Sequence, residues 1–199
     1  VENLGWIEAE RISILEPGVV ARRALDSPDS GIVDGHGLCL SLLAEAESHG
    51  AVLALGREVL ALETRSFGWS VEVRAGDARV ESIDGGVVVD AAGLDADRVA
   101  EWAGLPVDEL GWRQHLCKGD YFTLALGGAC APPTRLLYPV PQAAGLGIHV
   151  TLDLAGRMRF GPDTEYVSEV GYAVDPAKWV PFREAVGRYF PAVGAVDPG

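Results

Sequence analysis

The chain has 199 residues, of which 48% are hydrophobic and 23% charged, a composition that supplies a sizeable core and excludes global disorder. Acidic residues outnumber basic residues by 29 to 16, so nucleic acid and anionic membrane surfaces are not expected as partners. The three cysteines form no CxxC pair, so we predict no metal site and no disulfide framework, and a cytoplasmic location. No apolar run approaches the roughly 20 residues of a transmembrane helix.

The first half of the chain is expected to combine helices with short strands. Apolar side chains from Leu38 to Ala46 recur at helical spacing and predict a helix. Apolar runs and alternating apolar and polar residues predict strands. The expected elements are a short helix before Pro17-Gly18, a loop over 27–37, the helix over 38–48, a buried strand over 51–55, an antiparallel meander over 57–65, 69–76 and 78–83, a buried parallel strand over 87–93 and a helix over 95–104.

The second half is expected to be an antiparallel sheet backed by one helix. Asp175 is the predicted N-cap of an amphipathic helix over 175–190, with Pro176 at its first position. The expected strands lie in 113–126, with a break at Lys118-Gly119, and in 135–141, 145–154 and 157–163. The predicted fold class is therefore α+β, with an α/β part in the first half.

Five stretches of sequence carry a resemblance to a known family. They are SGIVDGHGL (30–38), VVVDAAGLDAD (87–97), KGDYF (118–122), LLYPVPQAAGLGIHVTLD (136–153) and RFGPD (159–163). In this order they resemble the L-2-hydroxyglutarate dehydrogenase/oxidase branch of the FAD-dependent glycine/D-amino-acid oxidase-like superfamily. That family opens with a strand and a GxGxxG turn for the FAD diphosphate, which this sequence lacks, so we expect the chain to correspond to an internal part of such an enzyme.

The resemblance implies a division into three parts. Residues 1–30 would extend the substrate domain, 31–98 would form part of the FAD-binding domain, and 99–199 would form the sheet and helix of the substrate-binding domain. A partial FAD domain leaves an apolar face open, so self-association through this half-domain is expected.

The function that the resemblance implies is oxidation of a small carboxylate, a 2-hydroxy acid such as L-2-hydroxyglutarate, by hydride transfer to FAD. Two alternatives stay open. The chain could be a non-redox module, derived from such a flavoprotein, that binds a small carboxylate or a protein. It could also belong to an FAD-dependent amino-acid or sarcosine oxidase.

Two places are implied as contacts of the cofactor. The small residues Ala91, Ala92 and Gly93 follow a predicted strand and let backbone approach FAD closely. Val59 matches a position whose backbone contacts adenine in the family. The ordinary alternatives are a turn that ends a strand and a strand valine.

His149 is the implied catalytic residue. From composition alone, a single histidine in an apolar strand is more simply a satisfied core or surface residue. The resemblance implies instead that this strand faces the flavin, so that His149 takes the substrate's hydroxyl proton or forms a hydrogen bond with its carboxylate. Strand alternation predicts Thr151 on the His149 face and Val150 pointing outward.

Other side chains are candidates for binding the substrate. Cations would hold its carboxylate, and phenol or hydroxyl groups would donate hydrogen bonds. The candidates are Lys118, Tyr121, Tyr138, Thr151 and Arg159. Each has an ordinary alternative as a solvated cation, a core aromatic or a strand former.

Overall fold

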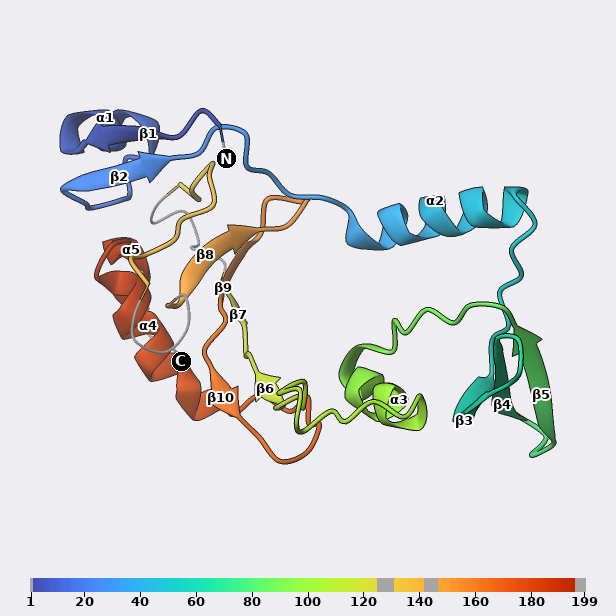
Figure 1. The fold of residues 1–199 in the computed structure, drawn as a ribbon. Helices are drawn as coiled ribbons and strands as arrows, with labels where there is room; N and C mark the ends of the chain where they lie inside the picture. The colour runs from blue at the N-terminus through green and yellow to red at the C-terminus, as the bar shows by residue number, and fades with distance from the viewer. Residues whose placement is uncertain (1, 125–130, 142–146, 196–199) are drawn as a thin grey trace. The chain divides into compact units, whose positions relative to one another are not determined.

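The chain folds as an α+β protein of helices and small antiparallel sheets, as predicted (Figure 1). The structure, a computed structural model, describes residues 2–124, 131–141 and 147–195. Two compact units divide the chain: Cys39–Leu116 forms one, and the segments up to Leu38 and from Cys117 onward form the other. Every strand pair among the described residues is antiparallel.

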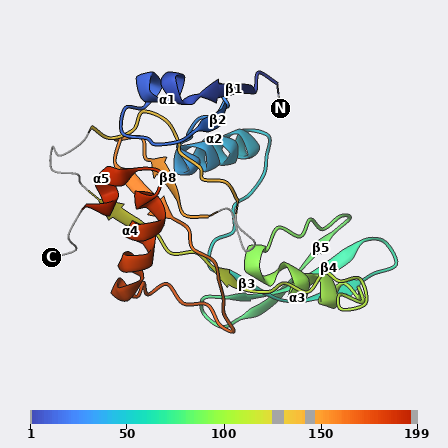
Figure 2. The same cartoon turned by 90° about the vertical axis from the view of Figure 1, so that its left-hand side faces the viewer.

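A three-stranded sheet in the order β7-β9-β8 forms the centre of the unit that holds both ends of the chain. Its strands are β7 (Phe122–Leu124), β8 (His149–Leu152) and β9 (Met158–Gly161). The helices α4 (Trp179–Gly187) and α5 (Pro191–Gly194) lie on one side of it (Figures 1 and 2). The core between sheet and helices contains Val150, Met158, Phe160, Phe182, Val186, Phe190 and Val193.

The predicted amphipathic helix is confirmed. Asp175 caps the turn, since its Oδ1 accepts a 2.9 Å hydrogen bond from the backbone N–H of Ala177. A 3₁₀ turn, η2 (Pro176–Lys178), leads into α4. Phe182 and Val186 are buried on the helix, so its apolar stripe faces the sheet as the periodicity predicts.

The remaining elements of this unit are short. They are β1 (Gly5–Glu8), α1 (Ala9–Leu15), β2 (Arg23–Asp26), β6 (Cys117–Lys118) and β10 (Glu165–Tyr166). The helix before Pro17 is confirmed, whereas the pairing of β1 with β2 was not foreseen. The buried carboxylate of Glu16 accepts hydrogen bonds from the backbone N–H and the hydroxyl of Thr134, which fastens the N-terminal segment to the chain before β8.

The other unit is built on the predicted meander. Its strands, in the order β3-β4-β5, are β3 (Arg57–Thr64), β4 (Trp69–Ala75) and β5 (Val80–Gly85). The 3₁₀ turn η1 (Gly93–Asp95) and the helix α3 (Ala96–Trp102) follow, and α3 contacts β3. The helix α2 (Gly35–Ser48) confirms the helical periodicity, and none of its residues is buried.

Three predicted strands are wrong. Residues 51–55 and 87–92 have no regular structure, and Val52 and Val87 are 88% and 82% exposed. A buried parallel strand needs hydrogen-bonded neighbours, and no described strand pairs with either segment. In 135–141 the pairing is reduced to a single bridge between Leu137 and Val150.

The compact units do not follow the predicted boundaries at 30/31 and 98/99. The second of these boundaries would cut through α3, which packs with the meander. Assignment of cofactor and substrate roles to the parts of the chain stays a prediction.

Long apolar helices are absent from the described part of the chain. None of the helices in it has both the length and the hydropathy needed to cross a membrane.

Candidate functional site

The face of the central sheet opposite the α4 core carries polar side chains. Thr151 and Thr123 both pair with Arg159, and His149 pairs with Gly161, so these residues share one face by strand register. The predicted neighbourhood of His149 and Thr151 agrees with this register. The prediction that Val150 points outward is wrong: Val150 is fully buried, because the opposite face is the one that packs on α4.

His149 is held between two aromatic rings. The Tyr138 ring stacks on the imidazole with centroids 4.2 Å apart and planes 17° apart. The Tyr121 ring lies edge-on at 6.5 Å. The His149 side chain is 5% exposed, and its burial lowers the pKa of the imidazole below its usual value, so the neutral form is favoured near neutral pH.

One hydrogen bond sets the tautomer of this imidazole. His149 Nδ1 lies 3.2 Å from the carbonyl oxygen of Gly147, which can only accept, so Nδ1 carries the proton. The lone pair is then on Nε2, which has no hydrogen-bond partner among the described residues. A neutral imidazole with a free Nε2 is a proton acceptor.

Tyr138 reaches His149 because its segment runs beside β8. Leu137 and Val150 exchange two backbone hydrogen bonds of 2.9 Å, which place the next residue along the chain beside His149. Tyr138 remains 54% exposed, so one face of its ring covers the imidazole while the side chain is also accessible to a ligand.

Arg159 supplies a cation on the same face of the sheet. Its guanidinium carbon lies 5.0 Å from the centre of the Tyr121 ring. Within the described segments, this ring is the only group that the Arg159 side chain contacts by a hydrogen bond, ion pair or ring interaction. A cation without a carboxylate partner can bind an anionic ligand.

The side chain of Lys118 contacts other residues than those around His149. Its ammonium group donates to the carbonyl oxygen of Ala173 and lies 3.2 Å from Asp120 Oδ1. The structure therefore brings together His149, Tyr121, Tyr138 and Arg159, with Thr151 on the same sheet face, but holds Lys118 in an ion-pair network.

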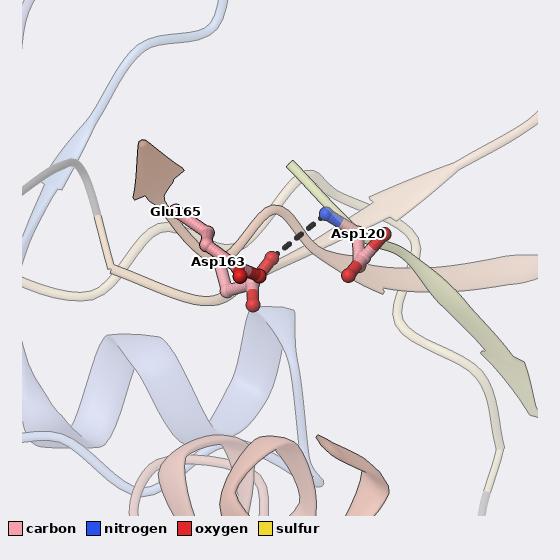
Figure 3. A group of neighbouring side chains, drawn as sticks. All are labelled: Asp120, Asp163 and Glu165. Carbon is pink, nitrogen blue, oxygen red and sulfur yellow. Dashed lines mark hydrogen bonds between the residues drawn. The ribbon is translucent and has the colours of Figure 1, made fainter. Parts of the chain in front are cut away.

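That network is an acidic cluster of Asp120, Asp163 and Glu165 (Figure 3). One oxygen of each carboxylate lies within 4.8 Å of the others, a spacing that a metal ion could use. Here Lys178 Nζ ion-pairs with all three, at 2.6 Å, 2.9 Å and 2.6 Å. The cluster is therefore an ion-pair network centred on Lys178.

The implied cofactor contacts lie in the unit of the meander. The loop of Ala91, Ala92 and Gly93 is exposed, Gly93 has a φ of +62°, and a Cβ there would meet nothing within 4 Å. Val59 lies on β3, an edge strand of its sheet, next to a register shift. Open backbone of this kind fits a flat group such as adenine. Since the sequence has no GxGxxG turn, these residues fit only part of FAD.

Two glycines of the site were missed at the sequence level. The Gly147 carbonyl sets the His149 tautomer, and Gly161 faces Tyr121. Both stand in the quoted stretches that carry the family resemblance, but only the strand register relates Gly161 to His149.

Comparisons with known proteins identify relatives of this chain. The chain is 29% identical, over its whole length, to a mitochondrial L-2-hydroxyglutarate dehydrogenase of Arabidopsis thaliana, of which it covers 49%. It is 30% identical to the human mitochondrial L-2-hydroxyglutarate dehydrogenase over 82% of the chain and 36% of that protein. With L-2-hydroxyglutarate dehydrogenase of Escherichia coli (strain K12) the identity is 27%, over 79% of the chain and 36% of that protein. The chain thus spans at most about half the length of these relatives.

A solved structure has the same fold. It is that of L-proline dehydrogenase from P. horikoshii, with a TM-score of 0.65 over 96% of this chain and 49% of that one, at 14% identity. The family described as FAD dependent oxidoreductase (DAO) matches residues 1–199. The chain is therefore a member of the FAD dependent oxidoreductase family, as its sequence stretches had indicated.

Proposed function

We propose that this chain provides the substrate-binding part of an FAD-dependent dehydrogenase that oxidises a 2-hydroxy acid of the L-2-hydroxyglutarate type. The observation that carries the proposal is the neutral His149, which lies on the same sheet face as Arg159; in the part of the chain that the structure describes, Nε2 of His149 is free to accept a proton and the Arg159 cation has no carboxylate partner. The names of the relatives from Arabidopsis, human and Escherichia coli support this substrate class.

The reaction converts a secondary alcohol into a ketone. Bound FAD would accept the hydride that leaves the α-carbon. Nε2 of His149 takes the hydroxyl proton as the carbonyl double bond forms, giving the 2-oxo acid and an imidazolium. Arg159 pairs with a carboxylate of the substrate, and Thr151 and Tyr138 offer hydroxyl groups beside it. The ring of Tyr138 shields the imidazole from water.

Under this proposal, the unit that contains the meander would contact the cofactor. The backbone of Val59 and of Ala91 to Gly93 would lie against FAD, and no side chain there obstructs a flat group at Gly93. The cytoplasmic location stays a prediction, and several of the relatives are named as mitochondrial.

The proposal is tested by substrate-dependent reduction of an artificial electron acceptor by the FAD-loaded protein. L-2-hydroxyglutarate should be oxidised, and D-2-hydroxyglutarate, sarcosine and L-proline should be oxidised far more slowly. Faster oxidation of sarcosine or L-proline would favour the amino-acid oxidase alternative. Binding of L-2-hydroxyglutarate without flavin reduction would favour the non-redox alternative.

His149→Gln tests the catalytic assignment. Loss of a general base lowers turnover by about 10²- to 10⁴-fold, so kcat should fall by that factor while the protein stays folded. His115→Gln, at an exposed histidine, is the matched control and should keep full activity. A His149→Gln enzyme within a few-fold of the parent would remove His149 from the mechanism.

A further inference from the structure

The segment before β7 and the end of β9 lie unusually close together, and the contact depends on glycine residues. A Cβ on Gly161 would lie 2.5 Å from the carbonyl oxygen of Asp120 and 2.8 Å and 2.9 Å from two ring atoms of Tyr121, closer than real Cβ atoms come. The φ of Gly161, +141°, is also one that L side chains rarely adopt. A second glycine, Gly119, lies in the segment that contains Tyr121, and a Cβ there would lie 2.7 Å from Pro162 Cβ. The ring of Tyr121 thus rests on the backbone of β9 at a place where only glycine fits.

The same ring contacts two groups of the proposed active site. The Arg159 guanidinium lies over it, two residues before Gly161 on β9, and the His149 imidazole meets it edge-on across the β8–β9 pair. Burial raises the pKa of the Tyr121 phenol, so Tyr121 is neutral throughout the physiological range.

We propose that Tyr121 is a positioning residue, held by Gly161, that orients the Arg159 guanidinium toward the substrate carboxylate. This inference rests on the proposed function, because it assigns a role within the same site. It differs from the sequence-level expectation that Tyr121 binds the substrate directly.

The conformational freedom of the Arg159 side chain affects how tightly it can bind a carboxylate. Arginine loses much rotamer entropy when it is fixed, so a guanidinium that is already oriented binds a carboxylate more tightly than a mobile one. No carboxylate in the described part of the chain orients Arg159. The face of the Tyr121 ring does so instead, and the ring itself cannot shift toward β9 because it is in contact with Gly161.

A double-mutant cycle tests this role in the FAD-loaded protein. Tyr121→Leu should raise KM for L-2-hydroxyglutarate by about fivefold, the loss expected for one cation–π contact, and should change kcat by less than about twofold. Tyr121→Phe keeps the ring and should behave like the parent. In an Arg159→Met background, Tyr121→Leu should have almost no further effect on KM, because the group it orients is gone.

Two results of the cycle would overturn the proposal. One is an equal rise in KM from Tyr121→Leu in both backgrounds, which would show that Tyr121 acts without Arg159. The other is a Tyr121→Phe enzyme as impaired as Tyr121→Leu, which would show that the hydroxyl group contacts the substrate.

A measurement without turnover separates this inference from the proposed function. The NMR signal of Arg159 Nε–H should be shifted by the ring current of Tyr121, and the shift should be lost in Tyr121→Leu and Gly161→Ala. Gly156→Ala is the control, since Gly156 also has a positive φ but its Cβ would meet nothing within 4 Å. An unshifted Arg159 signal in the parent protein would refute the positioning role. A shifted signal in a protein that does not oxidise 2-hydroxy acids would refute the proposed function and leave the orientation of Arg159 standing.

Discussion

At the scale of single residues, the His149 site depends on how well the imidazole is kept from water. Its pKa is lowered mainly by burial, and the hydrogen bond from Nδ1 to Gly147 opposes that shift. Among the residues that the structure describes, the groups facing the ring are Tyr138, Tyr121 and, beyond Tyr121, Arg159, and none of them is a carboxylate that would favour the imidazolium. The folded protein therefore prefers neutral His149.

Tyr138→Leu should raise the pKa of His149 toward its ordinary value of 6.5, because the stacked ring no longer shields the imidazole. An NMR titration of the His149 ring protons measures this directly. Tyr138→Phe should leave the pKa low, and Tyr172→Leu, at a tyrosine exposed elsewhere, should not change it. A low His149 pKa in Tyr138→Leu would mean that Tyr138 does not provide the shielding.

The lowered pKa of His149 also determines in which direction the stability of the fold and the activity change with pH. Since the folded state binds a proton to His149 less readily than the unfolded state, this residue destabilises the fold as pH drops below about 6.5. For the same reason, the acid limb of the pH–kcat/KM profile should lie below pH 6.5, and Tyr138→Leu should move it upward.

At the scale of elements, Lys178 joins the start of α4 to the chain segments next to β7 and β9. Its ammonium group contacts Asp120 before β7 and Asp163 and Glu165 after β9. Asp120 is 3% exposed, and the hydrogen bonds from Lys178 and Lys118 hold the pKa of its carboxyl below the ordinary value of 3.8. Ionised Asp120 therefore stabilises the fold above that pH, and the contribution is lost as the carboxyl becomes protonated in stronger acid.

Lys178→Met should lower the free energy of unfolding by about 3 kcal/mol, because it leaves a buried carboxylate with two acidic neighbours and less compensation. Urea denaturation at neutral pH measures the loss. Arg157→Met removes a largely exposed cation from its pair with Asp153, and as the control it should lower the free energy of unfolding much less. Equal losses for the two variants would show that the cluster is no more than a surface ion pair.

The sequence predicts well those elements that are determined by local residue patterns. The helix after Asp175 and the meander of β3, β4 and β5 follow from capping and alternation, which are local. The apolar run at 87–89 was predicted as a strand because strand formers are frequent there, but a strand also needs a partner, and partners are not encoded locally.

The same limit applied to the site. His149 could be singled out from its sequence surroundings, but the direction of Val150 could not, because both faces of β8 are buried and apolarity alone does not say which one packs on the helix. The grouping of Tyr121 with Arg159 and Gly161 required the pairing of β7 with β9, two strands that are distant in sequence.

At the scale of the whole molecule, many apolar side chains of the meander unit and of α2 face solvent. They include Leu40, Leu42, Val52, Leu55, Val87 and Val89. Exposed apolar surface of this extent favours association.

We therefore expect the 199-residue chain to self-associate with rising concentration, as sedimentation velocity would show. Leu42→Glu combined with Val52→Glu should shift it toward monomer. A control with the same added charge, Leu154→Glu combined with Val140→Glu, changes exposed apolar residues outside the meander unit and should not. A chain that sediments as a monomer at every concentration would contradict the expectation.

The two faces of the central sheet have a consequence for how such a protein can change over evolutionary time. Residues at alternate positions of β8 and β9 lie on opposite faces of the sheet: Val150, Met158 and Phe160 belong to the core, while His149 and Arg159 lie on the face of the proposed ligand. A substitution at His149, Thr151 or Arg159 would therefore change this face without removing a side chain of the core. This separation would allow a lineage to change the polar face of the sheet while the packing of β8 and β9 on the helices stays the same.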